Sequence, residues 1–94
     1  MTYSTVAELL ADPSRWTQRH AARMKCGKPV GARDARACCW CLLGAIEAIY
    51  DGQASQDAQC KVENEVGGRL LSVWNDDPGR THSEVVELCR RDGI

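Results

Sequence analysis

The longest apolar run of the chain extends from Asp34 to Tyr50 and predicts one long central helix. The run is too long for a typical strand but has a normal length for a helix. At about 100° per residue, Cys38, Leu42 and Ile46 fall on one apolar stripe. Asp34 is placed to cap the first turn. We therefore expect residues 34–50 to form a buried helix that the other segments cover.

Three further helices follow from capping and spacing patterns. A capping-box pattern predicts a short helix over about residues 5–11, and a second such pattern predicts a last helix over 82–91. Apolar residues at helical spacing predict a long helix over 56–73, capped by Ser55. Gly67-Gly68 interrupts this helix, so we expect a kink, a break or a close crossing against the small residues around Gly44.

Two segments carry turn signals. Cys26-Gly27 suits the turn of a short hairpin within residues 17–30, whereas a continued helix over Ser14–Met24 is the alternative. Pro78-Gly79 suits the central positions of a type II turn. The predicted fold is therefore mostly α. It is a single domain over residues 1–94, with three to four helices bundled around residues 34–50 and with or without one short β-hairpin.

Composition limits the classes of function. The formal net charge is −1, so the chain lacks the broad basic excess of most nucleic-acid binders, and nucleic acid is only a weakly supported partner. The N-terminal segment lacks the features of a secretory signal, and no apolar run reaches the length of a membrane span. We expect a cytoplasmic protein without a membrane partner.

Basic residues gather in one part of the sequence. This cluster comprises Arg15, Arg19, Arg23, Lys25, Lys28, Arg33 and Arg36, and the second half of the chain is acidic. If the segment is helical, Arg15, Arg19 and Arg23 form a basic ridge that could bind an acidic protein surface or a nucleic acid. One alternative is self-association, in which the basic part of one copy meets the acidic half of another. The simplest alternative is that the basic residues form a charged face exposed to solvent.

One face of the predicted central helix mixes charge with large side chains. Arg36, Trp40, Glu47 and Tyr50 lie on this face together with Leu43. Trp, Tyr and Arg are enriched in binding hot spots, so the face is a candidate partner surface. The alternative is that a loop or the N-terminal segment covers Trp40 and Leu43.

The densest polar cluster lies around the turn before the last helix. Trp74, Asn75, Asp76, Arg80 and His82 could line a pocket for a small ligand or a nucleotide. The alternative is a turn and a helix cap that an Asp76–Arg80 pair holds together. Because His82 and Glu84 would diverge by about 200° on a helix, they do not form an acid–base pair. No complete catalytic set is visible in the sequence.

Six cysteines raise the question of metal or redox chemistry. Cys38 and Cys41 have CxxC spacing, but no second ligand pair completes a zinc motif, and the pair falls inside the predicted helix rather than at its start. Buried free thiols are the simpler interpretation, and we expect no cofactor. A zinc-stabilised structural domain remains an alternative.

Several motifs together suggest a family. The chain combines Trp16, the run from Trp40 to Ile46, Trp74-Asn75-Asp76, and Gly79-Arg-Thr-His-Ser-Glu-Val-Val. In these motifs it resembles a group of small, uncharacterised bacterial and phage proteins classed as a domain of unknown function. The resemblance covers about residues 6–91 and implies an accessory gene, often on a phage or mobile element. We therefore expect a non-enzymatic interaction protein that binds a host protein complex, such as an immune effector that a phage inhibits.

Overall fold

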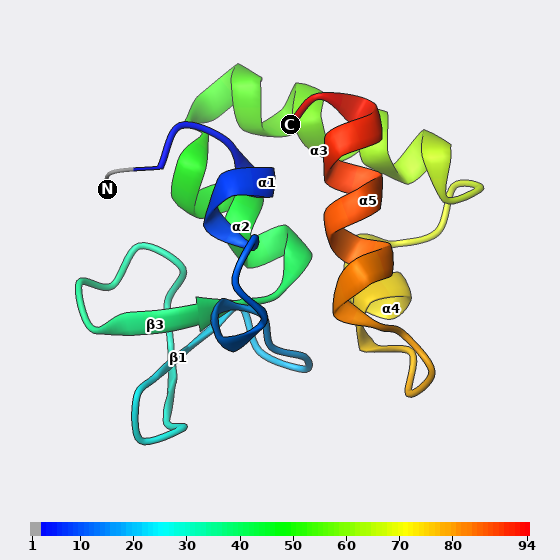
Figure 1. Ribbon diagram of the computed structural model, residues 1–94. Helices are drawn as coiled ribbons and strands as arrows, with labels where there is room; N and C mark the ends of the chain where they lie inside the picture. The colour runs from blue at the N-terminus through cyan, green and yellow to red at the C-terminus, as the bar shows by residue number, and fades with distance from the viewer. Residues whose placement is uncertain (1–2) are drawn as a thin grey trace.

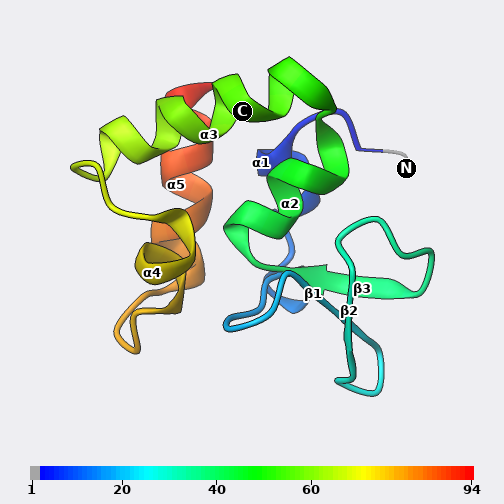
Figure 2. The ribbon, with the colours of Figure 1, turned by 180° about the vertical axis from the view of Figure 1, so that it is seen from behind.

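The computed structural model describes residues 3–94, which contain five α-helices and a three-stranded antiparallel sheet (Figure 1). In chain order the elements are α1 (Val6–Leu9), the 3-10 turn η1 (Pro13–Arg15), β1 (Ala22–Met24), β2 (Pro29–Val30), β3 (Ala37–Trp40), α2 (Leu42–Ile49), α3 (Gly52–Glu65), α4 (Leu71–Asp76) and α5 (His82–Asp92). The strands lie at one end of the molecule, and the helices form the rest (Figures 1 and 2). The protein is therefore a mixed α and β domain, and the prediction of a mostly helical bundle is wrong.

The predicted central helix over residues 34–50 is two elements. Its first part forms β3, which pairs with β1, and only Leu42–Ile49 is helical. Asp34 does not cap a helix; its Oδ1 instead accepts the Arg36 backbone N–H at 2.8 Å in a local turn. The cap of α2 is Cys41, whose Sγ accepts the Gly44 N–H at 3.2 Å. Pairing with β1 thus makes the first part of the run a strand, and the periodicity of its apolar residues did not reveal this.

The expected hairpin is present, and the alternative helix over Ser14–Met24 is not. β1 pairs with both neighbours in the order β2-β1-β3, with a bulge in its pairing to β3 between Arg23 and Met24. Gly27 has a φ of +91° and donates its N–H to the Met24 carbonyl at 2.8 Å. A glycine is favoured there because left-handed backbone angles crowd a Cβ atom.

The predicted helix over residues 56–73 is also divided. α3 starts earlier, at Gly52, and ends at Glu65, after which Gly67 and Gly68 take positive φ angles of +80° and +81°. α4 then begins at Leu71. The glycine pair therefore breaks the helix, one of the three outcomes expected, and Ser55 is not the cap. The glycine pair does not cross Gly44, which faces the backbone of Ala21 instead.

The first and last helices form where the capping patterns place them. Thr5 Oγ1 accepts the Glu8 N–H at 3.1 Å, and Thr81 and Glu84 form a reciprocal capping box. Between α4 and α5, the Arg80 N–H closes a turn onto the Asp77 carbonyl at 2.9 Å. Gly79 lacks the positive φ of a type II turn, so that predicted turn type is wrong.

All five helices contribute to one hydrophobic cluster. Its most completely buried side chains include Val6, Leu9, Leu42, Ile46, Val62, Leu71 and Val85. Burial of such side chains stabilises each by roughly 1.5–3 kcal/mol relative to exposure. Within residues 3–94, no helix is both long and apolar enough to cross a lipid bilayer.

Candidate functional site

Asn75 of α4 is the centre of a buried hydrogen-bond network. Its side chain is fully buried, and its Oδ1 accepts the Trp16 indole N–H at 2.8 Å and the Leu42 backbone N–H at 3.1 Å. Its Nδ2 donates to the Thr17 carbonyl at 3.2 Å. Buried polar groups must be paired in this way because desolvation is otherwise uncompensated. One amide therefore ties α4 to the start of α2 and to the chain that follows η1.

The segment Thr17–His20, which we call the Arg19 loop, is fastened to α4 by further bonds. Gln18 Nε2 donates to the carbonyls of Asn75 and Asp77 at 2.8 and 3.0 Å. The Arg19 backbone N–H donates to Asp76 Oδ1 at 2.7 Å. The same Asp76 oxygen accepts a bond from Asn75 Nδ2 at 3.0 Å. Residues 75–77, at the end of α4, therefore hold residues 17–19 of the loop by hydrogen bonds.

The chain just after the loop is fixed by a close backbone approach to α2. The Cys41 N–H donates to the Ala21 carbonyl at 3.1 Å. A Cβ atom at Gly44 would lie 1.9 Å from that same carbonyl oxygen. Only glycine permits this contact, which explains its place in the first turn of α2 despite its low helix propensity.

Arg19 is held in an unusual backbone conformation. Its φ is +78°, the only positive φ at a residue other than glycine within residues 3–94. Such angles cost a non-glycine residue about 1 kcal/mol or more and persist only where surrounding contacts enforce them. The Arg19 side chain is exposed, and within residues 3–94 its guanidinium makes no hydrogen bond or salt bridge. The loop therefore presents a free arginine on a fixed backbone.

The predicted basic ridge does not form, because the segment from Arg15 to Arg23 is not helical. Arg15 lies in η1 and donates Nε to the Leu9 carbonyl at 2.6 Å, with its guanidinium over the Tyr3 ring. Arg23 lies in β1 and donates to Thr17 Oγ1 at 3.1 Å. Both side chains support the local backbone, and among these three arginines only Arg19 has a guanidinium without a hydrogen bond or salt bridge to residues 3–94.

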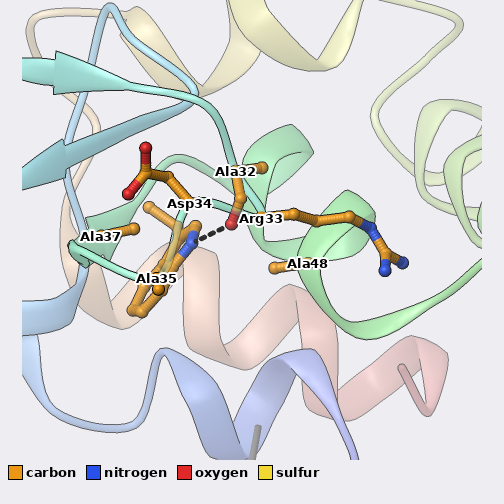
Figure 3. Close-up of a pocket in the computed structure, with 7 residues that line it drawn as sticks. Ala32, Arg33, Asp34, Ala35, Ala37 and Ala48 are labelled. Carbon is orange, nitrogen blue, oxygen red and sulfur yellow. Dashed lines mark hydrogen bonds between the residues drawn. The ribbon is translucent and has the colours of Figure 1, made fainter.

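The predicted partner face around Trp40 is not one exposed surface. Trp40 is 6% exposed, and its indole N–H donates to the Ala32 carbonyl at 2.9 Å (Figure 3). Its ring forms part of a hollow of about 370 Å³, lined mainly by alanines together with Arg33 and Asp34. Neighbouring segments therefore cover Trp40, as in the alternative interpretation, and Leu43 is half-buried.

The other residues of that face have separate roles. Arg36 pairs with Asp34 at 2.9 Å, and its guanidinium lowers the pKa of the Asp34 carboxyl to about 2. The Tyr50 hydroxyl donates to the Ile94 carbonyl at 2.8 Å, and burial raises the pKa of this hydroxyl. Glu47 is exposed. The structure does not bring these side chains together with Trp40.

The residues of the alternative ligand pocket serve structural contacts. The Arg80 guanidinium stacks 3.9 Å above the Trp74 ring and pairs with Glu84 at 3.1 Å, not with Asp76. His82 Nε2 contacts the Leu10 carbonyl. Trp74, Asp76 and His82 line three different shallow hollows. The polar cluster is thus divided among a helix cap, a stacked pair and the Asn75 network.

The cysteines do not form a metal cluster in the part of the chain that the structure describes. Cys38 is exposed on β3, whereas Cys41 is buried at the start of α2, so the CxxC pair joins a strand to a helix. Burial raises the pKa of the Cys41 thiol, and burial also raises that of Cys89 to about 12. Burial therefore favours the protonated form of both thiols, and a protonated thiol is a poor nucleophile.

Sequence reasoning found some parts of this site and missed others. Trp16, Asn75 and Asp76 were singled out from the sequence, and Arg19 was named as a basic contact. The role of Gln18 and the left-handed conformation of Arg19 were missed. The sequence around Gln18 carries no signal of the carbonyl groups that it binds, which lie 57 and 59 positions away.

Comparison with curated proteins and with solved structures finds no match. A family model described as "Family of unknown function (DUF6197)" matches residues 2–91, nearly the whole chain. The expected resemblance to a domain of unknown function is confirmed at the level of the family. The chain therefore belongs to DUF6197, a family of unknown function.

Proposed function

We propose that this protein is a non-enzymatic interaction protein that binds an acidic surface of a host protein complex through the Arg19 loop. One observation carries the proposal: Arg19 is exposed, lacks an internal partner within residues 3–94, and has a φ of +78°. Glycine would satisfy this backbone conformation at lower cost. The fold alone therefore does not explain why this position carries an arginine instead of a glycine. A contact between the arginine side chain and a partner would explain it.

The Arg19 loop has the properties of a preformed contact. Bonds from Gln18, Arg19 and Asn75 hold its backbone before any partner arrives. Ordering a loop on binding reduces affinity, so a loop that is already ordered retains more of its contact energy. Arginine is also one of the residue types enriched in interface hot spots.

The charge around the loop favours an acidic protein surface over a nucleic acid. A guanidinium pairs best with carboxylate or phosphate groups. Nucleic-acid binding usually requires several basic side chains aimed at successive phosphates, whereas Arg15 and Arg23 are bonded within the fold. With a net charge of −1 the chain as a whole does not attract a polyanion. A carboxylate on a protein is the partner group that fits a loop displaying one free arginine.

The proposed class of partner rests on the resemblance of the sequence motifs to small phage and bacterial proteins. We propose that the gene is an accessory gene of a phage or mobile element and that the acidic surface belongs to a host complex, such as one that defends the cell. Gene neighbourhood and the identity of the captured host complex are the observations that bear on this part of the proposal.

The test is affinity capture from host lysate with identification by mass spectrometry, using three variants. Arg19→Glu reverses the charge, and Arg19→Gly removes the side chain while keeping the backbone angle. Arg90→Glu is the matched control, because Arg90 is exposed on α5 and, within residues 3–94, its guanidinium makes no hydrogen bond or salt bridge. We expect the wild type and Arg90→Glu to capture the same complex and both Arg19 variants to lose it. Equal capture by all four proteins would rule out the Arg19 loop as the contact.

A further inference from the structure

α4 exposes two large apolar side chains that the core does not use. Leu70, at its N-cap, is 65% exposed and Val73 is 58% exposed, and within residues 3–94 they are the large apolar residues left open to solvent. Residues three apart share one face of a helix. Figure 2 shows α4 in front of α5, away from the strands. Covering these two side chains with another apolar surface would remove them from water and is therefore favourable.

A shallow hollow lies beside this pair. It has a volume of about 480 Å³ and is lined by Arg69, Ser72, Val73, Asp76, Asp77 and Pro78. Leu70 does not line the hollow, but its chain neighbour Arg69 does. A surface that carries an apolar projection beside a hollow able to receive it is complementary to itself under a twofold axis.

The charges at the two ends of the surface have opposite signs. Arg69 precedes Leu70, and within residues 3–94 its guanidinium has no hydrogen bond or salt bridge. Asp77 is exposed at the other end, where one of its oxygens accepts the Gly79 N–H at 2.9 Å. When two such surfaces meet antiparallel around Val73, the positive end of each lies opposite the negative end of the other. The surface is thus also complementary to itself in charge.

We propose that a second copy of this chain binds here and forms a twofold-symmetric dimer. Leu70 of each copy enters the hollow of the other, Val73 packs on Val73 at the axis, and Arg69 pairs with Asp77 across the interface. The surface is small, so the dimer is weak and forms at about 10–100 µM protein. The dimer does not require the partner proposed for the Arg19 loop, although the hollow adjoins that loop through Asp76 and Asp77.

Sedimentation equilibrium of the purified protein from about 1 µM to about 1 mM tests the proposal. We expect the mass to rise from the monomer value of 10.4 kDa to twice that value. Leu70→Glu should weaken the dimer by about 30-fold or more, because it places a charge in the apolar centre of the interface. A wild-type mass of 10.4 kDa at every concentration would overturn the proposal, as would a Leu70→Glu dimer as strong as the wild type.

Charge reversal tests the antiparallel pairing. Arg69→Glu should weaken the dimer, and the double variant Arg69→Glu/Asp77→Lys should strengthen it again relative to Arg69→Glu. Arg90→Glu on α5 serves as the control that leaves the dimer unchanged, and circular dichroism confirms that each variant is folded. If the double variant dimerises no better than Arg69→Glu alone, the pairing of Arg69 with Asp77 is wrong.

Discussion

At the scale of single residues, Gly44 is the position where a side chain is least tolerable. A Cβ atom there would lie 1.9 Å from the Ala21 carbonyl oxygen and 2.7 Å from its carbon, so the backbone itself must move. We expect Gly44→Ala to lower the free energy of unfolding by about 3 kcal/mol or more, although alanine is the better helix former. Urea unfolding measures this change. Gly31→Ala is the control, since nothing lies within 4 Å of its Cβ position, and an equal effect in both variants would refute the close approach.

Asp92 contributes a pH dependence to stability opposite in sign to that of Asp34, whose pKa is lowered. Its side chain is 7% exposed, and within residues 3–94 its Oδ2 has no hydrogen-bond partner. Burial and the nearby Glu65 carboxylate raise its pKa above the ordinary value of 3.8. The folded protein therefore holds this proton more tightly than the unfolded chain. The resulting stabilisation is present below pH 3.8 and is lost as the pH rises through the folded pKa.

Asp92→Asn tests this dependence. The amide stays neutral, so the variant should melt a few degrees above the wild type at pH 7. The difference should shrink as the pH falls through the folded pKa of Asp92 and should be smallest below pH 3.8. Thermal melts followed by circular dichroism at several pH values give the comparison. A variant that is less stable than the wild type at pH 7 would show that the Asp92 carboxylate is satisfied in the fold.

At the scale of the elements, local patterns predicted where helices begin and end better than whether a segment is a strand or a helix. The capping patterns at Thr5 and Thr81 located α1 and α5, and Gly67-Gly68 located a break. These features act within a few residues, so the sequence carries them directly. The run from Asp34 to Tyr50 contains both a strand and a helix of similar apolar character. Only the pairing of β3 with β1 distinguishes them, and that pairing is not local.

Asn75 joins elements that are distant in sequence, and its removal tests that connection. Asn75→Ala leaves the Trp16 indole N–H and the Leu42 N–H without their acceptor inside the protein. We expect the free energy of unfolding to fall by about 2–4 kcal/mol, measured in urea. Asn64→Ala on the exposed side of α3 is the control and should change it by less than about 0.5 kcal/mol. If both variants unfold alike, the network does not support the fold.

At the scale of the whole molecule, the proposed contact site depends on three segments that lie far apart in the sequence. Asn75 and Asp76 of α4 hold the Arg19 loop by hydrogen bonds. Gly44 of α2 has no side chain, so the backbone of Ala21, just after the loop, can approach α2 closely. From the sequence we expected Arg19 to contact an acidic partner as part of a helical ridge with Arg15 and Arg23. The structure separates these side chains because the segment belongs to a loop and a sheet. Tertiary contacts, which no local pattern encodes, therefore determine which arginine is available to a partner.

The most direct test of the account is hydrogen exchange at the Arg19 backbone amide, followed residue by residue by NMR. We expect slow exchange in the wild type although the Arg19 side chain is exposed, because Asp76 Oδ1 accepts that N–H at 2.7 Å. Asp76→Ala should make this amide exchange quickly while the Val62 amide within α3 keeps its protection. An Arg19 amide that exchanges at the rate of an unprotected amide in the wild type would contradict the claim that the fold holds this arginine in place for a partner.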